Sequence, residues 1–241
     1  MSQENTIYYL KLEDINNEDI IKNHIYPDLN SNYYFSDDFS EEFYVKLASL
    51  GFISTTTIYQ DYLYLLPELQ FEYAVLHFEN LHISKKVNKL IKKNNYQLVI
   101  NKNVDLVLKK LDEYHEPNWL INEYQELIKK LLDYKDPSID FELKSFELLE
   151  KNTNKLIAAE IGYKIGSTYT SLTGFSTKDK EHRNCGKLQL VLLAKYLEEN
   201  NYDFWNLGHP YMQYKFDLGA KEYKRAEFLK IWEKSVNKSN N

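Results

Sequence analysis

The stretch FELKSFELLEKNTNKLIAAEIGYKIGSTYTSLTGFS, residues 141–176, decides the fold class. Its apolar segments have the residue types and lengths of strands. A polar turn signal at 152–154 and a tight one at Gly166-Ser167 divide it into three parts. The stretch therefore predicts three consecutive antiparallel strands.

A buried helix is predicted to follow these strands. The segment GKLQLVLLAKYLEENN, residues 186–201, is apolar nearly all round, which is typical of a helix covered on most sides. YDFWNLG, residues 202–208, predicts one more strand, and helices are expected from about Met212 and over Arg225–Lys234. This order resembles the core of acetyltransferases. We expect an α+β fold with an acetyltransferase-like, mixed and largely antiparallel sheet flanked by helices.

The first part of the chain predicts a smaller N-terminal α/β lobe. We place it at residues 1–70, with the acetyltransferase-like domain at 71–241. Ser40 can cap a helix that Gly51 ends in a left-handed turn. The further elements expected before residue 137 are strands at Ile7–Leu12, Phe52–Ile58, Tyr62–Leu66, Tyr73–Phe78 and Gln97–Ile100, and helices at Glu18–His24, from Ser84, at Val104–Tyr114 and at Trp119–Leu132.

Composition narrows the class of protein. The chain has 241 residues, a formal net charge of −6 and a single cysteine, Cys185, so no disulfide framework can form within it. Its first residues lack the basic and apolar regions of a signal peptide, and no apolar run reaches membrane-spanning length. We expect a cytoplasmic monomer without membrane contact. The negative charge argues against a protein whose whole surface binds nucleic acid.

One local segment is nevertheless strongly basic. SKKVNKLIKKNN, residues 84–95, places lysines around an apolar stripe at helical spacing. These lysines are Lys85, Lys86, Lys89, Lys92 and Lys93. The segment is either an ordinary solvated helix face or a helix that contacts phosphates.

The loop before the buried helix tests for an acyl carrier. Acetyl-coenzyme A sites read R/Q-x-x-G-x-G/A, whereas this loop reads RNCGKL, with Arg183 and Gly186 in place. Leu188 stands where a small residue is needed, and we expect it to crowd the phosphate path. Binding of acetyl-coenzyme A is therefore not favoured.

Several segments, in order from Tyr33 to Trp232, resemble the leucyl/phenylalanyl-tRNA–protein transferase family. SDDFSEEFYVKLASLGFI resembles the N-terminal helix of that family, and ENLHISKKVNKLIKK resembles its Leu-His-Ile-Ser segment and basic helix. NWLINEYQELIKKL, from Asn118, resembles its Trp-Ile segment. LIAAEIGYKIGSTYTSLTGFS resembles its glycine-rich strand pair, and DLGAKEYKRAEFL resembles its C-terminal Leu-Gly-Ala signature.

The resemblance implies an activity. The family moves an amino acid from the 3′ end of an aminoacyl-tRNA to the N-terminal amine of a protein, which marks that protein for degradation. The reaction is an ester aminolysis, in which positioning of the reactants supplies much of the rate. We expect aminoacyl-tRNA as co-substrate, the N-terminus of an acceptor protein as partner, and no metal or free cofactor. The six histidines show no metal-ligand spacing.

The resemblance also implies residues of the donor site. Trp119 matches a tryptophan that contacts the terminal adenosine, where stacking is worth about 1–3 kcal/mol per base; alternatively it is a core residue. Lys85, Lys86 and Lys89 match the basic helix that meets acceptor-stem phosphates. The other residues that we expect at the aminoacyl-tRNA site are Tyr169, Ser171, Tyr211, Tyr214 and Lys215. Tyr211 and Lys215, four apart, are expected to share a helix face.

Departures from the family pattern concern the proton route. Leu172 stands where the family has an acidic residue, and Asn206 and Gly208 stand where it has Asp and Gln. Asn206 can hold an amine or polarise a carbonyl but is no base. His209 is the local candidate for the proton acceptor, with a loop histidine as the alternative. Glu160 is a candidate acid or base if it faces inward.

Three functions remain open from the sequence. The first is an aminoacyl-tRNA-dependent protein aminoacyltransferase, or a close variant of it with altered acceptor preference. The second is an N-acyltransferase that uses acyl-coenzyme A, and the third is a non-catalytic binding module of the same fold. Charged tRNA and acetyl-coenzyme A as alternative ligands would separate the first two.

Overall fold

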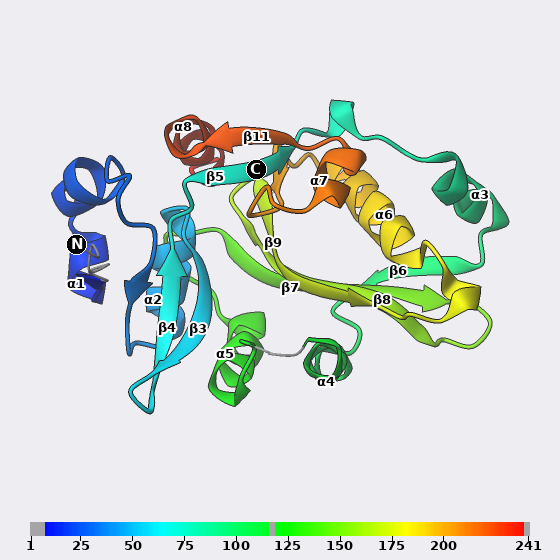
Figure 1. The fold of residues 1–241 in the computed structure, drawn as a ribbon, viewed down its shortest axis with the longest axis horizontal. Coiled ribbons are helices and arrows are strands. Elements are labelled where there is room, and N and C mark those ends of the chain that lie inside the picture. The colour runs from blue at the N-terminus through cyan, green and yellow to red at the C-terminus, as the bar shows by residue number, and fades with distance from the viewer. Residues whose placement is uncertain (1–7, 116–118, 239–241) are drawn as a thin grey trace, which may run out of the picture.

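The computed structural model describes residues 8–115 and 119–238, and its centre is a seven-stranded sheet (Figure 1). The strand order is β11-β5-β10-β9-β8-β7-β6. All neighbouring pairs are antiparallel except β9 and β10, which run parallel. The strands of this sheet are β5 (Glu72–Leu76), β6 (Tyr96–Ile100), β7 (Phe141–Glu150), β8 (Leu156–Ile165), β9 (Thr168–Ser176), β10 (Phe204–Asn206) and β11 (Lys221–Lys224).

Helices cover both faces of the sheet (Figure 1). Side chains of α6 pack with Trp205 and Tyr169 on one face, whereas side chains of α4 and α5 pack with Ile161 and Tyr163 on the other. The expected α+β class with a mixed, largely antiparallel sheet is thereby confirmed. The helices from here on are α3 (Lys85–Lys93), α4 (Val104–Tyr114), α5 (Asn122–Asp133), α6 (Cys185–Glu199), α7 (Gln213–Leu218) and α8 (Arg225–Val236).

Strands β9 and β10 diverge inside the sheet. Their parallel register runs from Thr168–Phe204 to Thr170–Asn206 and stops there, because β10 ends while β9 continues along β8. The loop after β10, residues 207–212, therefore leaves the sheet beside the second half of β9. Backbone and side-chain groups next to this divergence are free of ladder pairing to β10, which is a suitable position for a site.

The N-terminal part adds two small sheets. β1 (Tyr8–Tyr9) pairs with β2 (Tyr34–Phe35), and β3 (Ile53–Tyr59) pairs with β4 (Tyr62–Glu68). The helical elements here are α1 (Leu12–Asn16), the π-helix η1 (Ile20–Ile25) and α2 (Glu41–Ser49). One buried cluster includes residues from this part and from α5 and α8, so the division at residue 70 stays a prediction.

Local signals account for several element ends. Ser40 accepts a hydrogen bond from the Phe43 amide at the start of α2, and Gly51 after that helix has φ +89°. The expected strand Ile7–Leu12 is wrong beyond Tyr9, because α1 begins at Leu12; Ile7 lies outside the described residues. The expected helix at Trp119 starts only at Asn122.

The Leu-Gly-Ala signature has a structural explanation. Gly219 ends α7 in a left-handed conformation with φ +111°, and a Cβ there would lie 2.0 Å from the carbonyl oxygen of Asn80. Only glycine fits both demands. Leu218 and Ala220 on either side are buried, as expected for a core position.

A helix that crosses a membrane must be both long and apolar. In residues 8–115 and 119–238, none of the helices combines the length and apolarity that crossing a bilayer requires.

Candidate functional site

A buried carboxyl group lies next to the divergence of β9 and β10. Glu160 on β8 accepts a hydrogen bond of 2.6 Å from the Ser171 hydroxyl, and the Trp205 indole donates to that same hydroxyl at 2.8 Å. Burial raises the pKa of Glu160 to about 7, against the opposing effects of Ser171, Tyr169 and Lys215. The sequence left open whether Glu160 faces inward; it does, and its role as an acid or base stays a prediction.

The Tyr169 hydroxyl belongs to the same cluster. It lies close enough to Glu160 for the carboxylate charge to raise its pKa further, after burial, the larger cause. Among the described residues, however, this hydroxyl has no hydrogen-bond partner of acceptable geometry. Tyr169 and Ser171 therefore sit at the carboxyl group, and their expected contact with aminoacyl-tRNA stays a prediction.

Lys215 on α7 is another buried ionisable group, and the charge of Glu160 acts on it. Its ammonium donates hydrogen bonds to the carbonyl oxygens of Leu207 and His209, and it is only 7% exposed. Burial lowers the pKa of Lys215 to about 8, while the charge of Glu160 acts in the opposite direction. Lys215 thus fixes the loop after β10.

The expected shared face of Tyr211 and Lys215 is wrong. α7 begins at Gln213, so Tyr211 lies before the helix and is 78% exposed, whereas Lys215 points inward. The ammonium of Lys215 is held by two carbonyl oxygens rather than being free for a phosphate.

Glu160 predicts a particular dependence of stability on pH. A glutamate ionises near pH 4.5 in the unfolded chain, whereas Glu160 keeps its proton to about pH 7 in the folded protein. Between these values the folded state binds more protons, so this group lowers the free energy of unfolding as pH rises. We expect Glu160→Gln to be more stable than the wild type at pH 8, by roughly 3 kcal/mol, with little difference at pH 4.5. Urea unfolding of both proteins at pH 8 and at pH 4.5 measures this difference in the free energy of unfolding.

Glu147 on β7 provides the control for that experiment. It is equally buried, but its carboxylate accepts hydrogen bonds from the Lys102 and Asn103 amides and from the Ser145 hydroxyl. All three donors meet the same oxygen, Oε1, so Glu147→Gln can keep an acceptor there but removes the negative charge that strengthens these hydrogen bonds, and it should lower stability at pH 8. A loss of stability at pH 8 in Glu160→Gln would contradict the assignment.

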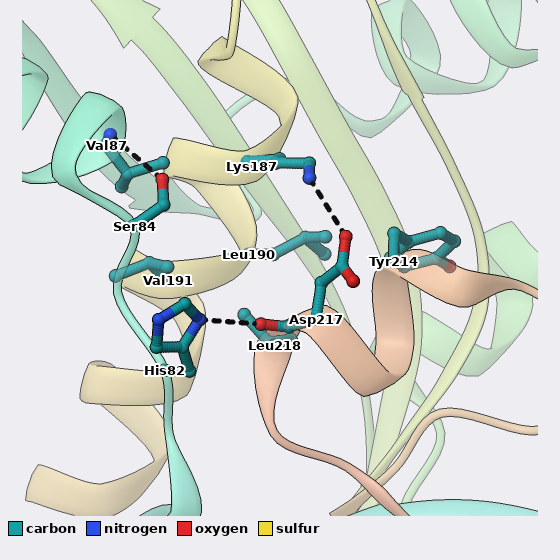
Figure 2. A pocket seen from close by; sticks show the side chains of 9 residues that line it. All are labelled: His82, Ser84, Val87, Lys187, Leu190, Val191, Tyr214, Asp217 and Leu218. Atoms are coloured by element: carbon teal, nitrogen blue, oxygen red, sulfur yellow. Dashed lines mark hydrogen bonds and ion pairs between the residues drawn. The ribbon is translucent and has the colours of Figure 1, made fainter.

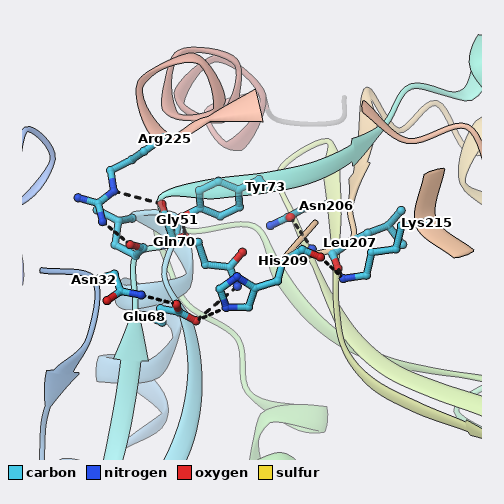
Figure 3. A network of polar contacts seen from close by, with 12 residues as sticks. Asn32, Gly51, Glu68, Gln70, Tyr73, Asn206, Leu207, His209, Lys215 and Arg225 are labelled. Atoms are coloured by element: carbon cyan, nitrogen blue, oxygen red, sulfur yellow. Dashed lines mark hydrogen bonds and ion pairs between the residues drawn. The ribbon is translucent and has the colours of Figure 1, made fainter. Parts of the chain in front are cut away.

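His209 forms a second cluster on the loop after β10 (Figure 3). Its Nε2 lies 2.8 Å from Oε2 of the buried Glu68. The other carboxylate oxygen of Glu68, Oε1, accepts a hydrogen bond of 2.7 Å from Nδ2 of Asn32. Since an ionised carboxylate only accepts, Nε2 of His209 carries the hydrogen and Nδ1 keeps the lone pair in the neutral ring. Nδ1 has no hydrogen-bond partner within the described parts of the chain. Tyr211 stacks on the imidazole at 4.6 Å between centroids.

Asn206 ends β10 between the two clusters. It is buried, its Oδ1 accepts from the Gly208 amide at 2.9 Å, and its Nδ2 lies 3.4 Å from the Thr170 hydroxyl. The side chain thus shapes the turn into the loop. A contact with substrate stays a prediction.

Trp119 packs against the protein. Its ring meets Tyr124 edge-on at 5.2 Å, it is partly buried against the core, and its carbonyl accepts a hydrogen bond from Thr56 on β3. Asn118, with which the matching motif begins, lies outside the described residues. Trp119 and His209 both neighbour the β3–β4 hairpin, but neither lines the cavity described below. A cleft shared by their two rings stays a prediction.

The lysines of α3 are exposed and unpaired. Ser84 caps the helix, Val87 is buried beneath it, and all five lysines point to solvent. Within residues 8–115 and 119–238 none of the five pairs with an acidic side chain, whereas Lys22, Lys110 and Lys155 elsewhere do. The expected amphipathic basic helix is confirmed, and its positive charge is not neutralised locally.

A cavity of about 170 Å³ lies between α3, α6 and α7 (Figure 2). Leu190, Val191 and Leu218 form an apolar part, and Lys187 pairs with Asp217 at 3.3 Å at its edge. Tyr214 also lines it, and burial together with the charge of Glu160 raises the pKa of Tyr214 to about 12. Tyr214 therefore connects the cavity with the buried carboxyl group.

Leu188 does not project into the loop before α6, contrary to the prediction that it crowds the phosphate path there. It is 2% exposed and packs in the core between α6 and the sheet, because the helix turns it inward. The loop therefore gives no steric reason against an acyl carrier.

One group of side chains has the proximity of metal ligands. Ligand atoms of Asp179, Glu181 and His182 lie within 4.8 Å of one another. Asp179 already pairs with Lys155, and Nδ1 of His182 is bonded to the Tyr96 hydroxyl. The expectation of a reaction without metal stays a prediction.

Sequence reasoning missed Glu68 and Gln70, the residues that face His209. Both are buried polar side chains at the end of β4 and in the turn to β5. A glutamate and a glutamine flanking Leu69 next to Pro67 carry no local pattern that distinguishes a site from a turn. Only their burial, which the sequence does not show, marks them.

Comparisons with known proteins identify related sequences. The family model described as leucyl/phenylalanyl-tRNA protein transferase matches residues 75–233. A leucyl/phenylalanyl-tRNA–protein transferase of Flavobacterium johnsoniae is 27% identical over 165 residues, which are 65% of this chain and 70% of that protein.

Two solved structures show a weaker likeness. FemX has a TM-score of 0.49 at 9% identity, with 81% of this chain and 70% of that chain covered. A conserved protein of unknown function from Staphylococcus epidermidis has a TM-score of 0.45 at 11% identity, covering 80% and 70%. Nothing about chemistry follows from either.

Proposed function

The chain belongs to the leucyl/phenylalanyl-tRNA protein transferase family, and from this premise we propose that it transfers an aminoacyl group from a tRNA to the N-terminal amine of a protein. The match over residues 75–233 carries the proposal, because it spans both the basic helix and the loop after β10. Aminoacyl-tRNA is the co-substrate, and the reaction needs no metal or further cofactor.

The proposed reaction requires proton transfer. The amine nitrogen attacks the ester carbonyl, a C–N bond forms, and the bond to the ribose oxygen breaks. The amine loses one proton and the ribose oxygen gains one. His209 Nδ1 is the proposed acceptor of the first proton, since Glu68 holds Nε2 in the donor tautomer.

Glu160 and Lys215 have a supporting place in this proposal. Lys215 holds the carbonyl oxygen of His209, and the charge of Glu160 favours the ammonium form of Lys215. The pair therefore keeps the loop that carries His209 in position. Asn206 is proposed to orient the reacting groups at the start of the same loop.

The exposed lysines of α3 are proposed to bind RNA phosphates. Changing Lys85, Lys86 and Lys89 to glutamine removes three unpaired positive charges. We expect weaker tRNA binding and a plot of log K against log salt that is shallower by about 2 to 3, because fewer counterions are released. Filter binding over a range of salt concentrations measures this slope.

Lys221, Lys230 and Lys234 form the matched control. They are exposed on β11 and α8, and within the described residues they are also without ion pairs. Their triple change to glutamine alters net charge equally. If both triple variants lower the slope by the same amount, α3 is not the phosphate-binding element.

Acceptor preference is proposed to differ from that of the family. Leu172, which stands in place of the acidic residue, is packed against the apolar core and offers no negative charge to a basic acceptor residue. We therefore propose that acceptors with an uncharged first residue react as well as those that begin with Arg or Lys.

Single-turnover transfer tests the function. Charged tRNAs are mixed with the protein and with peptides that begin with basic or uncharged residues, and acetyl-coenzyme A is offered as the alternative donor. Product from charged tRNA supports the proposal. Product from acetyl-coenzyme A alone would assign an acyl-coenzyme A-dependent enzyme, and tRNA binding without any product would indicate a binding module.

A further inference from the structure

Gln70 contains a buried oxygen atom without a donor. The residue lies in the turn between β4 and β5, is 2% exposed, and its Oε1 has no hydrogen-bond partner within the described parts of the chain. Leaving a buried acceptor unpaired destabilises a folded protein. In native proteins such an atom is completed by a water, by an ion or by a donor of a bound ligand.

The orientation of the Gln70 amide is determined by Glu68. Nε2 of Gln70 lies 3.5 Å from Oε2 of Glu68. Because a carboxylate only accepts hydrogen bonds, the nitrogen must face it and Oε1 must point away. The backbone of Gln70 is fixed as well. Its N–H donates a hydrogen bond to the Tyr73 hydroxyl, and its carbonyl oxygen accepts one from the Arg225 side chain. The orphan acceptor is therefore held in place.

Gln70, in the turn between β4 and β5, lies beside the loop that carries His209 (Figure 3). A Cβ at Gly208 would lie 3.8 Å from Nε2 of Gln70, and Glu68 Oε2 is approached by both Gln70 and His209. The loop after β10 thus carries Nδ1 of His209 and lies next to Oε1 of Gln70, and neither atom has a hydrogen-bond partner among the described residues.

We propose that Oε1 of Gln70 binds the N-terminal amine of the acceptor, a step that rests on the proposed function. A neutral primary amine has two N–H groups. One faces the proton acceptor His209, the other donates to Gln70, and the nitrogen lone pair is left to attack the ester. The substrate class is therefore a primary amine, and a peptide that begins with proline, with one N–H in the neutral form, is a poor acceptor.

Gln70→Met tests this assignment, because it keeps the volume and removes the acceptor. We expect the wild type to bind a peptide with a free N-terminus about 10-fold more tightly than its N-acetylated form, and the variant to lose this difference. The KM for the acceptor should rise about 10-fold with donor binding unchanged. The free energy of unfolding should stay equal or increase, since an unpaired buried group is removed.

Gln189→Met on α6 is the matched control. Gln189 is also buried and has an unpartnered Nε2 in the described chain, but it lies on α6 and not in the turn between β4 and β5 that carries Glu68 and Gln70. Its replacement should leave peptide binding and transfer unchanged.

The outcomes separate the two proposals. If Gln70→Met keeps the preference for a free amine while the wild type transfers normally, the inference is wrong and the function stands. If the wild type transfers from none of the donors, the function is wrong. In that case a free-amine preference that depends on Gln70 would still support the amine site.

Discussion

Replacing His209 with alanine is expected to lower the single-turnover rate of aminoacyl transfer by about 10²- to 10⁴-fold, the usual contribution of a general base. Nε2 of this imidazole is fixed by a buried carboxylate, and its Nδ1 has no hydrogen-bond partner in the part of the chain that the structure describes. Binding of charged tRNA should not change, since the lysines of α3 remain. Rapid-quench measurement at saturating donor and acceptor gives the rate.

Two further variants distinguish proton transfer from support of the loop. His209→Gln keeps a donor to Glu68 but has no basic nitrogen, so it should be as slow as the alanine variant. Tyr211→Leu removes the ring stacked on the imidazole and leaves its hydrogen bond intact, so it should retain most of the rate. Turnover in His209→Gln equal to the wild type removes His209 from the mechanism.

Replacing Arg225 with methionine is expected to lower the free energy of unfolding by about 4 kcal/mol, more than most surface or core changes. Its guanidinium is 1% exposed and donates to backbone carbonyls instead of a carboxylate. The acceptors are the carbonyl oxygens of Asp28, Ser31, Leu69 and Gln70. Methionine leaves the buried oxygens of Leu69 and Gln70 and the partly buried oxygens of Asp28 and Ser31 without these donors, which is the costly case.

Lys224→Met, one residue earlier, is the control for Arg225. Lys224 is exposed and pairs with Glu72 and Glu222, so its loss should change the free energy of unfolding only slightly, because exposed ion pairs are screened by solvent. Arg225→Lys should lie between the two, because an ammonium reaches fewer of the carbonyl oxygens. Equal stability of the Arg225→Met and Lys224→Met variants in urea unfolding would show that the carbonyl network contributes little.

Arg225 also connects stability with the candidate site. Its side chain ties the segment 28–31 and the turn 69–70 to the start of α8. Because Gln70 and Glu68 flank Leu69, a loosened turn would shift both groups that face His209. The variant should therefore lose transfer activity at temperatures where it is still folded.

Local sequence was sufficient where local forces decide. The turn at Gly166-Ser167 and the polar turn at 152–154 correctly predicted β7, β8 and β9, and serine caps located α2 and α3. By contrast, β11 was missed. Its residues 221–224 are mostly polar and exposed, and they form a strand because they pair with β5, which lies about 150 positions earlier in the chain.

The sequence by itself determined the order of most strands and helices, the basic face of α3 and the family resemblance. These depend on spacing, caps and charge, which act between residues a few positions apart. Only the tertiary structure decided that Glu68 faces His209 across 141 positions, that Glu160 is buried, and that Lys215 turns inward. The partner and the solvent exposure of a polar side chain are set by segments distant in the chain, and no local pattern contains them.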